Sequence, residues 1–438
     1  MSVVRSPVRS VVRSPVRGVL GGGVNLLGQA TSYLKGIAPY HWFDFINDRC
    51  LYASNDVGGV SGATGYSFAR ASQGYYTNAD GTLTSFASGA LRRGNRGVLI
   101  EGARTNLLLQ SQTFDNASWT KTDTTVTADS VVAPNGTTTA DLFTAGVAGN
   151  DTVRQDVTVS SGATVTYSRM LKRGNHDWVN FILADGANGV RGWFNLATGA
   201  VGTQSVSGTG SAGGIGIEAL ANGFYRCWIT GSVPSSTTYR CSSSSAAANA
   251  SFTRVNGGER YEWGAQLEVG SFPSSYSPTT TASATRAADV LSCTAIAAYP
   301  ESLWSEFERT GDTDFTEVIM QLDDGTANER VAIGISGSDT FTGLQVAGGA
   351  TVAGPTVAGT IALNTVYKGA GRFELNNCNV ARSGTLGTND TSCALPATPS
   401  MLRFGRTAAG ANGFFGYIHR AAVFNSGVVD ANLQAITT

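Results

Sequence analysis

Apolar and polar residues alternate in two neighbouring stretches of the chain, VRQDVTV (residues 153–159) and TVTYSRM (residues 164–170). Because successive side chains of a β-strand point to opposite faces, this period of two places one face of each strand inward and the other outward. Gly and Asn turns bound both runs, and similar short runs with turn signals about every 8 to 12 residues continue through residues 111–289. These patterns predict one β-sandwich of jelly-roll size in the middle of the chain.

The composition extends this prediction to the whole chain. Only 14% of the 438 residues are charged, whereas a globular domain carries about 25%. The polar residues are mostly Ser, Thr, Asn and 55 Gly, which favour short strands and turns over long surface helices. A formal net charge of −1 disfavours nucleic-acid binding, and no apolar run is long enough to span a membrane. We therefore expect an all-β protein that neither binds nucleic acid nor inserts into a membrane.

Composition and turn signals divide the chain into four ranges. Residues 1–36 form an extended arm and hinge with a short helix near the end, and residues 37–110 form a β-rich N-terminal region. The jelly roll occupies residues 111–289. Residues 290–438 are predicted to form a second sandwich with a closing helix at residues 430–436. The fold class is thus two tandem β-sandwiches, jelly-roll and lectin-like, preceded by an extended N-terminal arm.

The arm contains an octad, SVVRSPVR, which occurs twice without change at residues 2–9 and 10–17. Its prolines block a helix and favour extended backbone. Extended segments commonly become ordered against a partner's sheet edge or groove. We interpret the arm as a peptide that anchors the chain to another protein through four evenly spaced arginines: Arg5, Arg9, Arg13 and Arg17. A disordered tail is the alternative. The N-terminus lacks the features of a signal peptide, so we expect synthesis and folding in the cytoplasm.

Catalytic and metal-binding patterns are not found. The six cysteines lack metal-site spacing and are expected to be buried thiols, although the pairs Cys227–Cys241 and Cys378–Cys393 could be neighbours on paired strands. Glu262 and Glu268 are predicted to share a strand face but to lie about 20 Å apart, too far for a glycosidase pair. An acidic hairpin, Asp323-Asp324 with Asn328, offers oxygen ligands to Ca²⁺ but is better explained as a solvated turn. We expect no enzyme activity, no cofactor and no metal site, with Ca²⁺ as the one cation considered.

Nine ordered segments spread over about half of the chain resemble tail-fibre and head-spike-fibre proteins of tailed phages and gene transfer agents. They are FARAS (68–72), GVLIEGARTNLL (97–108), FDNASWTK (114–121), PNGTTTAD (134–141), FNLATG (194–199), NGFYR (222–226), YEWGAQLE (261–268), YSPTT (276–280) and TRAAD (285–289). The last sandwich resembles laminin-G and concanavalin-like lectins through FGYIHRAAVF (415–424) and VDANLQAIT (429–437).

This resemblance implies a carbohydrate-binding jelly roll in the middle of the chain and a structural adhesin on the surface of a virion. The resemblance does not specify whether the protein is attached to the head, the neck or the tail of the particle. Fibres of this kind commonly form homo-oligomers, and a trimer is favoured.

Sugar binding requires an aromatic face for the pyranose ring and polar groups for its hydroxyls. The loop KRGNHDW (172–178) offers both kinds of group within seven residues. A second tryptophan follows at the next strand. The candidate sugar-binding residues are Arg173, Asn175, His176, Asp177, Trp178 and Trp193, although core packing is an alternative role for both tryptophans. Trp228 and Trp263 lie in apolar strands and are interpreted as structural.

Together these observations predict a virion spike or fibre subunit, anchored by its arm to another virion protein and binding host cell-surface polysaccharide during adsorption. Two alternatives stay open. One is a capsule depolymerase or glycosidase whose carboxylates the sequence does not place. The other is a purely structural decoration protein without a glycan partner.

Overall fold

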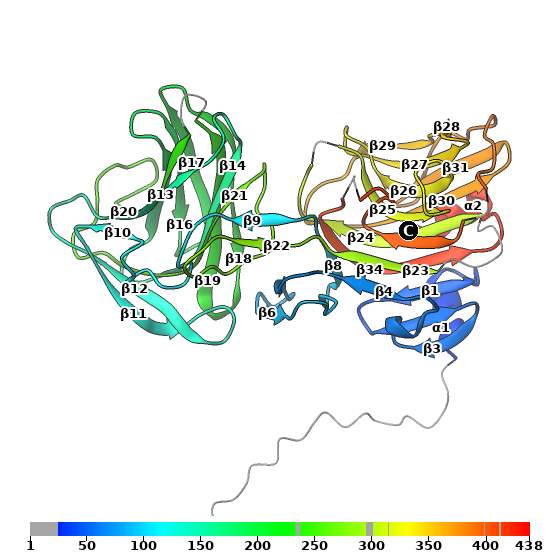
Figure 1. The fold of residues 1–438 in the computed structure, drawn as a ribbon, viewed down its shortest axis with the longest axis horizontal. Helices are drawn as coiled ribbons and strands as arrows, with labels where there is room; N and C mark the ends of the chain where they lie inside the picture. Colours follow the sequence, from blue (N-terminus) through cyan, green and yellow to red (C-terminus); the bar gives the residue numbers. More distant parts are fainter. Residues whose placement is uncertain (1–24, 234–236, 295–300, 314, 398, 411–412) are drawn as a thin grey trace, which may run out of the picture.

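The computed structural model describes residues 25–233, 237–294, 301–313, 315–397, 399–410 and 413–438. Within these ranges the chain forms two β-sandwiches joined by a narrow connection (Figure 1). The predicted fold class, all-β with two sandwiches, is confirmed. Residues 1–24 of the predicted arm, which include its four arginines, lie outside the described residues.

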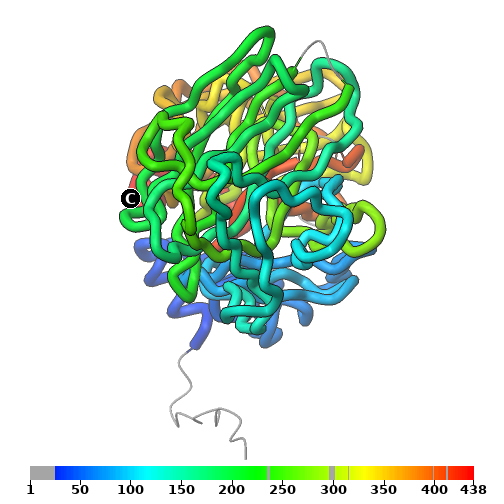
Figure 2. The backbone as a smooth tube through the Cα atoms, turned by 90° about the vertical axis from the view of Figure 1, so that its left-hand side faces the viewer, coloured from blue at the N-terminus to red at the C-terminus, as the bar shows by residue number. Residues whose placement is uncertain are grey.

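The middle sandwich consists of two six-stranded antiparallel sheets. The sheet that faces away from the second sandwich is called the distal sheet; its strands, in order, are β10 (Thr120–Thr122), β13 (Thr152–Thr158), β20 (Thr238–Ala246), β15 (Trp178–Ala184), β16 (Gly189–Asn195) and β17 (Ala200–Ser207). The other, the proximal sheet, contains β11 (Thr124–Val132), β12 (Thr138–Ala145), β21 (Glu259–Val269), β14 (Val165–Arg173), β19 (Phe224–Ser232) and β18 (Ser211–Ala219). Figure 2 shows the distal sheet in front of the rest of the molecule.

The two stretches that predicted the sandwich are strands β13 and β14, as expected. Val165, Tyr167 and Leu171 of β14 are fully buried and pack against Val153 of β13 and Phe181 of β15 in one core between the sheets. Each such side chain contributes about 1.5–3 kcal/mol when it leaves water. The alternation therefore identified the inward face of these strands correctly.

One prediction about strand β21 is wrong. Glu262 and Glu268 do not share a face, because a β-bulge shifts the register of β14 and β21 between Ser168 and Met170, beside Gly264 with φ +62°. Glu262 points between the sheets, where it accepts hydrogen bonds from Arg169 (Nη1, 2.5 Å) and from Ser243 of the distal sheet (Oγ, 2.6 Å). Glu268 points outward. An extra residue in one strand reverses the alternation beyond it, and sequence periodicity alone does not reveal that.

The second sandwich combines strands from both ends of the described chain. One sheet contains ten strands: β3 (Asn55–Gly58), β2 (Arg49–Tyr52), β1 (His41–Asp44), β34 (Gly416–Phe424), β24 (Ser302–Arg309), β30 (Val366–Glu374), β31 (Asn377–Arg382) and β32 (Thr385–Leu386), with β8 (Gly97–Ile100) and β7 (Arg93–Gly94) beside β34. The other contains β28 (Ala350–Ala353), β27 (Thr340–Ala347), β26 (Arg330–Ile335), β25 (Glu317–Asp323), β33 (Met401–Phe404), β23 (Val290–Thr294) and β4 (Ser67–Ala69), with β29 (Thr356–Thr360) beside β27. A separate hairpin pairs β5 (Gly74–Thr77) with β6 (Leu83–Phe86).

The β-rich range 37–110 therefore supplies strands to both sheets of the second sandwich. β1 pairs with β34 (Trp42 opposite Ala422), and β4 pairs with β23 (Phe68 opposite Leu291). The chain starts this sandwich, leaves it to build the middle one, and returns to complete it. Figure 1 shows the blue strands directly beside the red and green ones.

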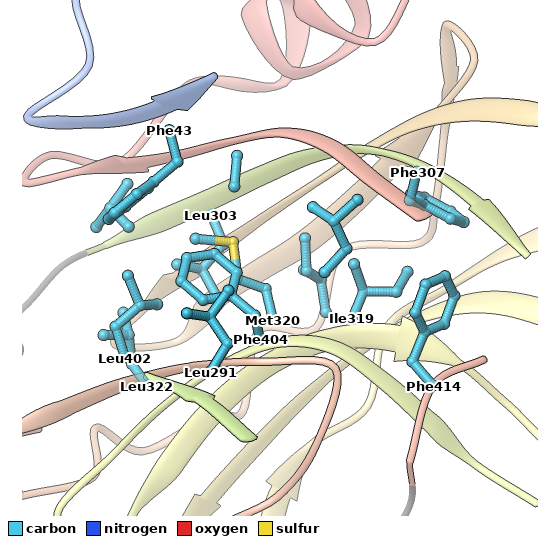
Figure 3. Packing of buried hydrophobic residues seen from close by; sticks show 14 of the residues in the cluster. Phe43, Leu291, Leu303, Phe307, Ile319, Met320, Leu322, Leu402, Phe404 and Phe414 are labelled. Carbon is cyan, nitrogen blue, oxygen red and sulfur yellow. The ribbon is translucent and has the colours of Figure 1, made fainter. Parts of the chain in front are cut away.

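Buried aromatic and aliphatic side chains fill the space between the two sheets of the second sandwich (Figure 3). Phe43 from the N-terminal part packs edge-on against Phe404 from the C-terminal part, with ring centroids 5.1 Å apart. Two short helices, α1 (Leu26–Tyr33) and α2 (Asp430–Ile436), cover the outer face of the ten-stranded sheet, where Trp304 donates its indole hydrogen to the carbonyl of Ile436 (2.9 Å). Both helices match their predicted positions. None of the helices in the described ranges has the length and apolarity of a membrane span.

All six cysteines are buried and free, as expected for isolated thiols. Cys378 and Cys393 are neighbours, because both donate to the carbonyl oxygen of Glu374 at 3.3 Å. Cys227 and Cys241 belong to the same core, but they come from facing sheets of the middle sandwich and not from paired strands as predicted.

The two sandwiches are joined by one pair of short strands, β9 (Arg104–Asn106) and β22 (Ala284–Arg286). A buried group of charged residues, the junction network, lies at its end. The carboxylate of Asp289 accepts hydrogen bonds from the guanidiniums of Arg70 (3.1 Å) and Arg92. The guanidinium of Arg92 also pairs with Glu101 (2.7 Å). Arg286 lies 3.5 Å from Glu101 and 3.9 Å from Asp289. None of these side chains exceeds 4% exposure.

We expect Asp289→Ala to lower the free energy of unfolding by about 3–5 kcal/mol, because it leaves buried guanidiniums without their partner. Urea unfolding followed by tryptophan fluorescence measures this change. Asp56→Ala is the matched control: it breaks a 2.9 Å ion pair with Arg49 whose side chains are 41% and 44% exposed, and such pairs contribute about 0–1 kcal/mol. Equal effects of the two substitutions would contradict a structural role for the junction network.

Candidate functional site

The predicted sugar-binding loop follows strand β14. Arg173 and Asp177 form an exposed ion pair within it (Nε to Oδ1, 2.6 Å). Asn175 is engaged with the backbone, donating to the carbonyl of Gly257 (3.0 Å) and accepting from the amide of Glu259 (2.7 Å). These contacts give the loop a fixed shape, and its role in sugar binding stays a prediction.

The remaining predicted residues are more deeply placed. His176 is 7% exposed, and burial together with the nearby charge of Arg260 lowers its pKa to about 4. Trp193 is 1% exposed and donates its indole hydrogen to the carbonyl of Ser251 (2.9 Å), so it has no free ring face. Trp178 is half-buried at the start of β15.

The acidic hairpin that offered ligands to Ca²⁺ is engaged in other contacts. Asp323 is buried and pairs with Arg403 (2.8 Å), and Asp324 accepts from the hydroxyl of Thr326 (2.6 Å) within its own turn. In the described part of the chain, no cluster of three His, Cys, Asp or Glu side chains has a metal-binding arrangement.

A cleft of about 500 Å³ lies between the two sandwiches. One wall is the outer face of β18 and β19 in the proximal sheet, and the floor includes the connecting segment 271–275. The opposite wall belongs to the second sandwich and includes Arg96, Leu363, Asn364 and Tyr417. Figure 1 shows β18 and β19 on one side of the narrow connection and β34 on the other.

Trp228 of β19 is the largest side chain of the first wall. Cys227 and Ile229 point into the core, so the alternation turns Trp228 outward, toward the second sandwich. Its indole leans across β18 over Gly216, where an added Cβ would lie 2.1 Å from a ring carbon. Only glycine leaves space for this ring. The partly exposed indole is thereby held against backbone on one side while it lines the cleft on the other.

Polar groups flank Trp228 on the same face. Arg226 donates from Nη2 to Ser168 Oγ (3.1 Å) and lies opposite Glu218 in the strand register, and its Nε has no hydrogen-bond partner among the described residues. The hydroxyls of Thr230 and Thr166 are 2.8 Å apart. This face thus combines an aromatic ring with hydroxyl, carboxylate and guanidinium groups.

The opposite wall is rigid. The guanidinium of Arg96 lies 3.9 Å from the centroid of the Tyr417 ring and pairs with Glu308 (Nη2 to Oε1, 2.5 Å). Tyr417 donates its hydroxyl hydrogen to the carbonyl of Thr77 (3.1 Å). Because these side chains already have partners, the cleft is preformed rather than assembled on binding.

Two carboxylates are among the lining residues, Glu101 and Glu218. Burial alone would raise the pKa of Glu101, but the charges of Arg286 and Arg92 and hydrogen bonds from Ser275 lower it to about 2. Glu101 is therefore ionised at neutral pH and does not act as a proton donor there.

Sequence reasoning interpreted Trp228 as structural because its neighbours are apolar. The two-residue alternation of the strand could have shown its orientation. In FYRCWIT (224–230), Cys227 and Ile229 point inward, so Trp228 lies on the outer face. The closeness of a second sandwich to that face could not be read from the local pattern.

No family model matches the chain, and no curated protein matches it. Among solved structures, the chain is similar to the CBM40 of Ruminococcus gnavus IT-sialidase bound to alpha2,6 sialyllactose, with 15% identity, 32% of this chain and 85% of that chain covered, and a TM-score of 0.29. It is similar to a heptameric SAP-like pentraxin from Limulus polyphemus, with 10% identity, coverage of 33% and 70%, and a TM-score of 0.26. It is also similar to domains LG4-5 of the mouse laminin alpha1 chain, with 10% identity, 74% of this chain and 88% of that chain covered, and a TM-score of 0.23.

The lowered pKa of His176 predicts a pH effect. Its folded-state pKa of about 4 lies below the ordinary value near 6.5. Between these two values the unfolded chain takes up a proton that the folded chain does not, so stability falls as the pH decreases from about 6.5 to about 4. Against His176→Leu, wild type should lose about 3 kcal/mol more between pH 7 and pH 4. Urea titrations at both pH values measure this, and parallel losses would contradict it.

Proposed function

We propose that this protein binds carbohydrate in the cleft between its two sandwiches, without cleaving it. The observation that carries the proposal is the partly exposed indole of Trp228, fixed over Gly216 and flanked by Arg226, Glu218 and Thr230. An indole face packs against the C–H groups of a pyranose, and the surrounding polar groups match its hydroxyls. A volume of about 500 Å³ is within the ordinary range of small-ligand sites.

The state of the cleft carboxylates supports binding over hydrolysis. A glycosidase uses one carboxylic acid that is protonated at working pH, which requires a raised pKa. Glu101 has the opposite environment, between arginines that lower its pKa. Glu101 therefore does not supply the proton that hydrolysis would place on the leaving oxygen.

We further propose that the protein acts as a spike or fibre subunit on the surface of a virion, where it attaches the particle to host polysaccharide. Support comes from the ordered segments that resemble phage fibre proteins. Several of them, FARAS (68–72), GVLIEGARTNLL (97–108) and TRAAD (285–289), contribute side chains to the junction network that joins the sandwiches. Many copies on one particle would turn weak single sites into firm attachment.

The binding proposal is tested with purified protein on a panel of bacterial surface polysaccharides. On the glycan that wild type retains, Trp228→Ala should weaken binding about tenfold or more, because it removes the stacking face, and Trp228→Phe should lose less. Affinity electrophoresis measures retention, and thermal unfolding verifies the fold of each variant.

Trp178→Ala serves as the comparison on the other sheet. A loss in Trp178→Ala with normal binding by Trp228→Ala would return the site to the loop at residues 172–178. A fall in the chain length of the glycan would overturn the non-enzymatic part of the proposal. Absence of binding across the panel would favour a purely structural virion component.

The anchoring role of the arm is tested by deleting residues 2–17. The truncated protein should fold and bind glycan as wild type does, because every described strand of the two sandwiches comes from residues 41–424. It should be missing from purified particles, as measured by immunoblotting. Normal incorporation of the truncated chain would contradict the anchoring role.

A further inference from the structure

A second group of unusual side chains lies on the outer face of the distal sheet, on the side of the middle sandwich opposite to the cleft. Phe181 and Leu183 of β15 point into the core, so Ile182 points outward. Arg191 of β16 lies opposite Ile182 in the register and therefore shares its face. This places a guanidinium on the distal surface of the molecule.

The guanidinium of Arg191 has an aromatic neighbour but no acidic one. It lies 5.2 Å from the centroid of the Phe252 ring, and within the residues that the structure describes it makes no ion pair. Phe252 is 61% exposed and rests edge-on against the buried ring of Trp193, at 5.5 Å and 82°. Burial lowers the pKa of Arg191. An unpaired, partly desolvated cation beside an exposed ring is costly unless a ligand uses it.

A second guanidinium, that of Arg254, comes from the same loop as Phe252. Its Nη1 donates to the carbonyl of Ser245 (2.9 Å), and its Nε lies 3.9 Å from Asp151, a long and weak contact. Burial lowers the pKa of Arg254, the negative charge of Asp151 raises it, and the positive charge of Arg191 lowers it. Arg191 contacts Phe252, which is two residues from Arg254 in the chain, and the two positive charges oppose each other, which an anion placed beside them would relieve.

Beneath this loop the same face carries polar side chains that are fully buried. Asn180 lies opposite Ser244, and Ile182 lies opposite Ser242. Asn180 Oδ1 and the hydroxyls of both serines have no hydrogen-bond partner within the described ranges, although all three residues have 0% exposure. Buried polar atoms without a partner in the protein call for another one, such as an ordered water or a ligand.

We propose that Arg191, Phe252 and Arg254, here called the arginine patch, form a second carbohydrate site that takes a sugar bearing a carboxylate. A guanidinium pairs with a carboxylate through two parallel hydrogen bonds. The exposed ring of Phe252 offers the stacking surface beside it. The arginine patch lies on the opposite sheet from the cleft and does not depend on the cleft binding any glycan.

The test compares two probes of the same shape, tetragalacturonic acid and its fully methyl-esterified form, by isothermal titration calorimetry. Wild type should bind the acid at least tenfold more tightly than the ester, with affinity falling as salt is added. Arg191→Gln should lose this preference. Arg240→Gln is the matched control, because it removes one guanidinium from the same sheet, where Arg240 already pairs with Asp156 (3.5 Å), and should leave the preference intact.

Three outcomes would overturn the proposal: equal binding of acid and ester by wild type, unchanged preference in Arg191→Gln, or binding of a tetraglutamate peptide as tightly as the acid. The last would assign the arginine patch to an acidic protein partner. Trp228→Ala should bind tetragalacturonic acid normally. This variant separates the two sites, since failure of the cleft proposal would leave the uronate result unchanged.

Discussion

The junction network holds the two sandwiches in one arrangement, and the candidate site depends on that arrangement. Two three-residue strands alone would act as a hinge. Three guanidiniums and two carboxylates buried around them change this, because charges removed from water are tolerated only in a geometry that pairs them. Carbonyl oxygens complete the shell: Arg70 donates to Ala87 (2.8 Å), and Arg286 donates to Gly102 (2.8 Å). Ser275, which follows the last strand of the middle sandwich, donates to Glu101 from its amide (2.9 Å) and from its hydroxyl (2.6 Å), so a rotation of that sandwich would break these two contacts.

The middle sandwich uses the same device inside its own core. Arg169 and Arg260 both pair with Glu262, at 2.5 and 2.7 Å, and Arg260 also lies 3.3 Å from Asp151. The chain thus has few charges, and several of them are fully buried between or beside sheets. Such networks add little net stability compared with apolar packing, but they accept few alternative registers. In a protein made of many similar short strands, that selectivity matters for correct pairing.

Local pattern predicted what is local in this structure. The alternating runs gave strands β13 and β14, the terminal segment gave helix α2, and the scarcity of charge gave the all-β class. Local pattern did not give the pairing of β1 with β34, because nothing within a strand specifies a partner so distant in sequence. The same limit hid the candidate site. Trp178 and Trp193 were predicted to bind sugar because polar residues surround them in the sequence. Trp228 became a candidate only when the structure placed the second sandwich opposite it.

The interleaved order of the chain also constrains how the protein is made. β34 pairs with β1, β24 and β8, so it occupies a central position in the ten-stranded sheet although it is synthesised among the last residues described. The middle sandwich can complete its core while the chain is still being translated. The first strands of the second sandwich must wait, with apolar faces exposed, until β34 emerges. Long-range pairing of this kind slows folding and exposes strand edges to aggregation. Folding of the second sandwich is thus a late, whole-chain event, which makes the arrival of residues 416–424 the step that commits the protein to its final shape.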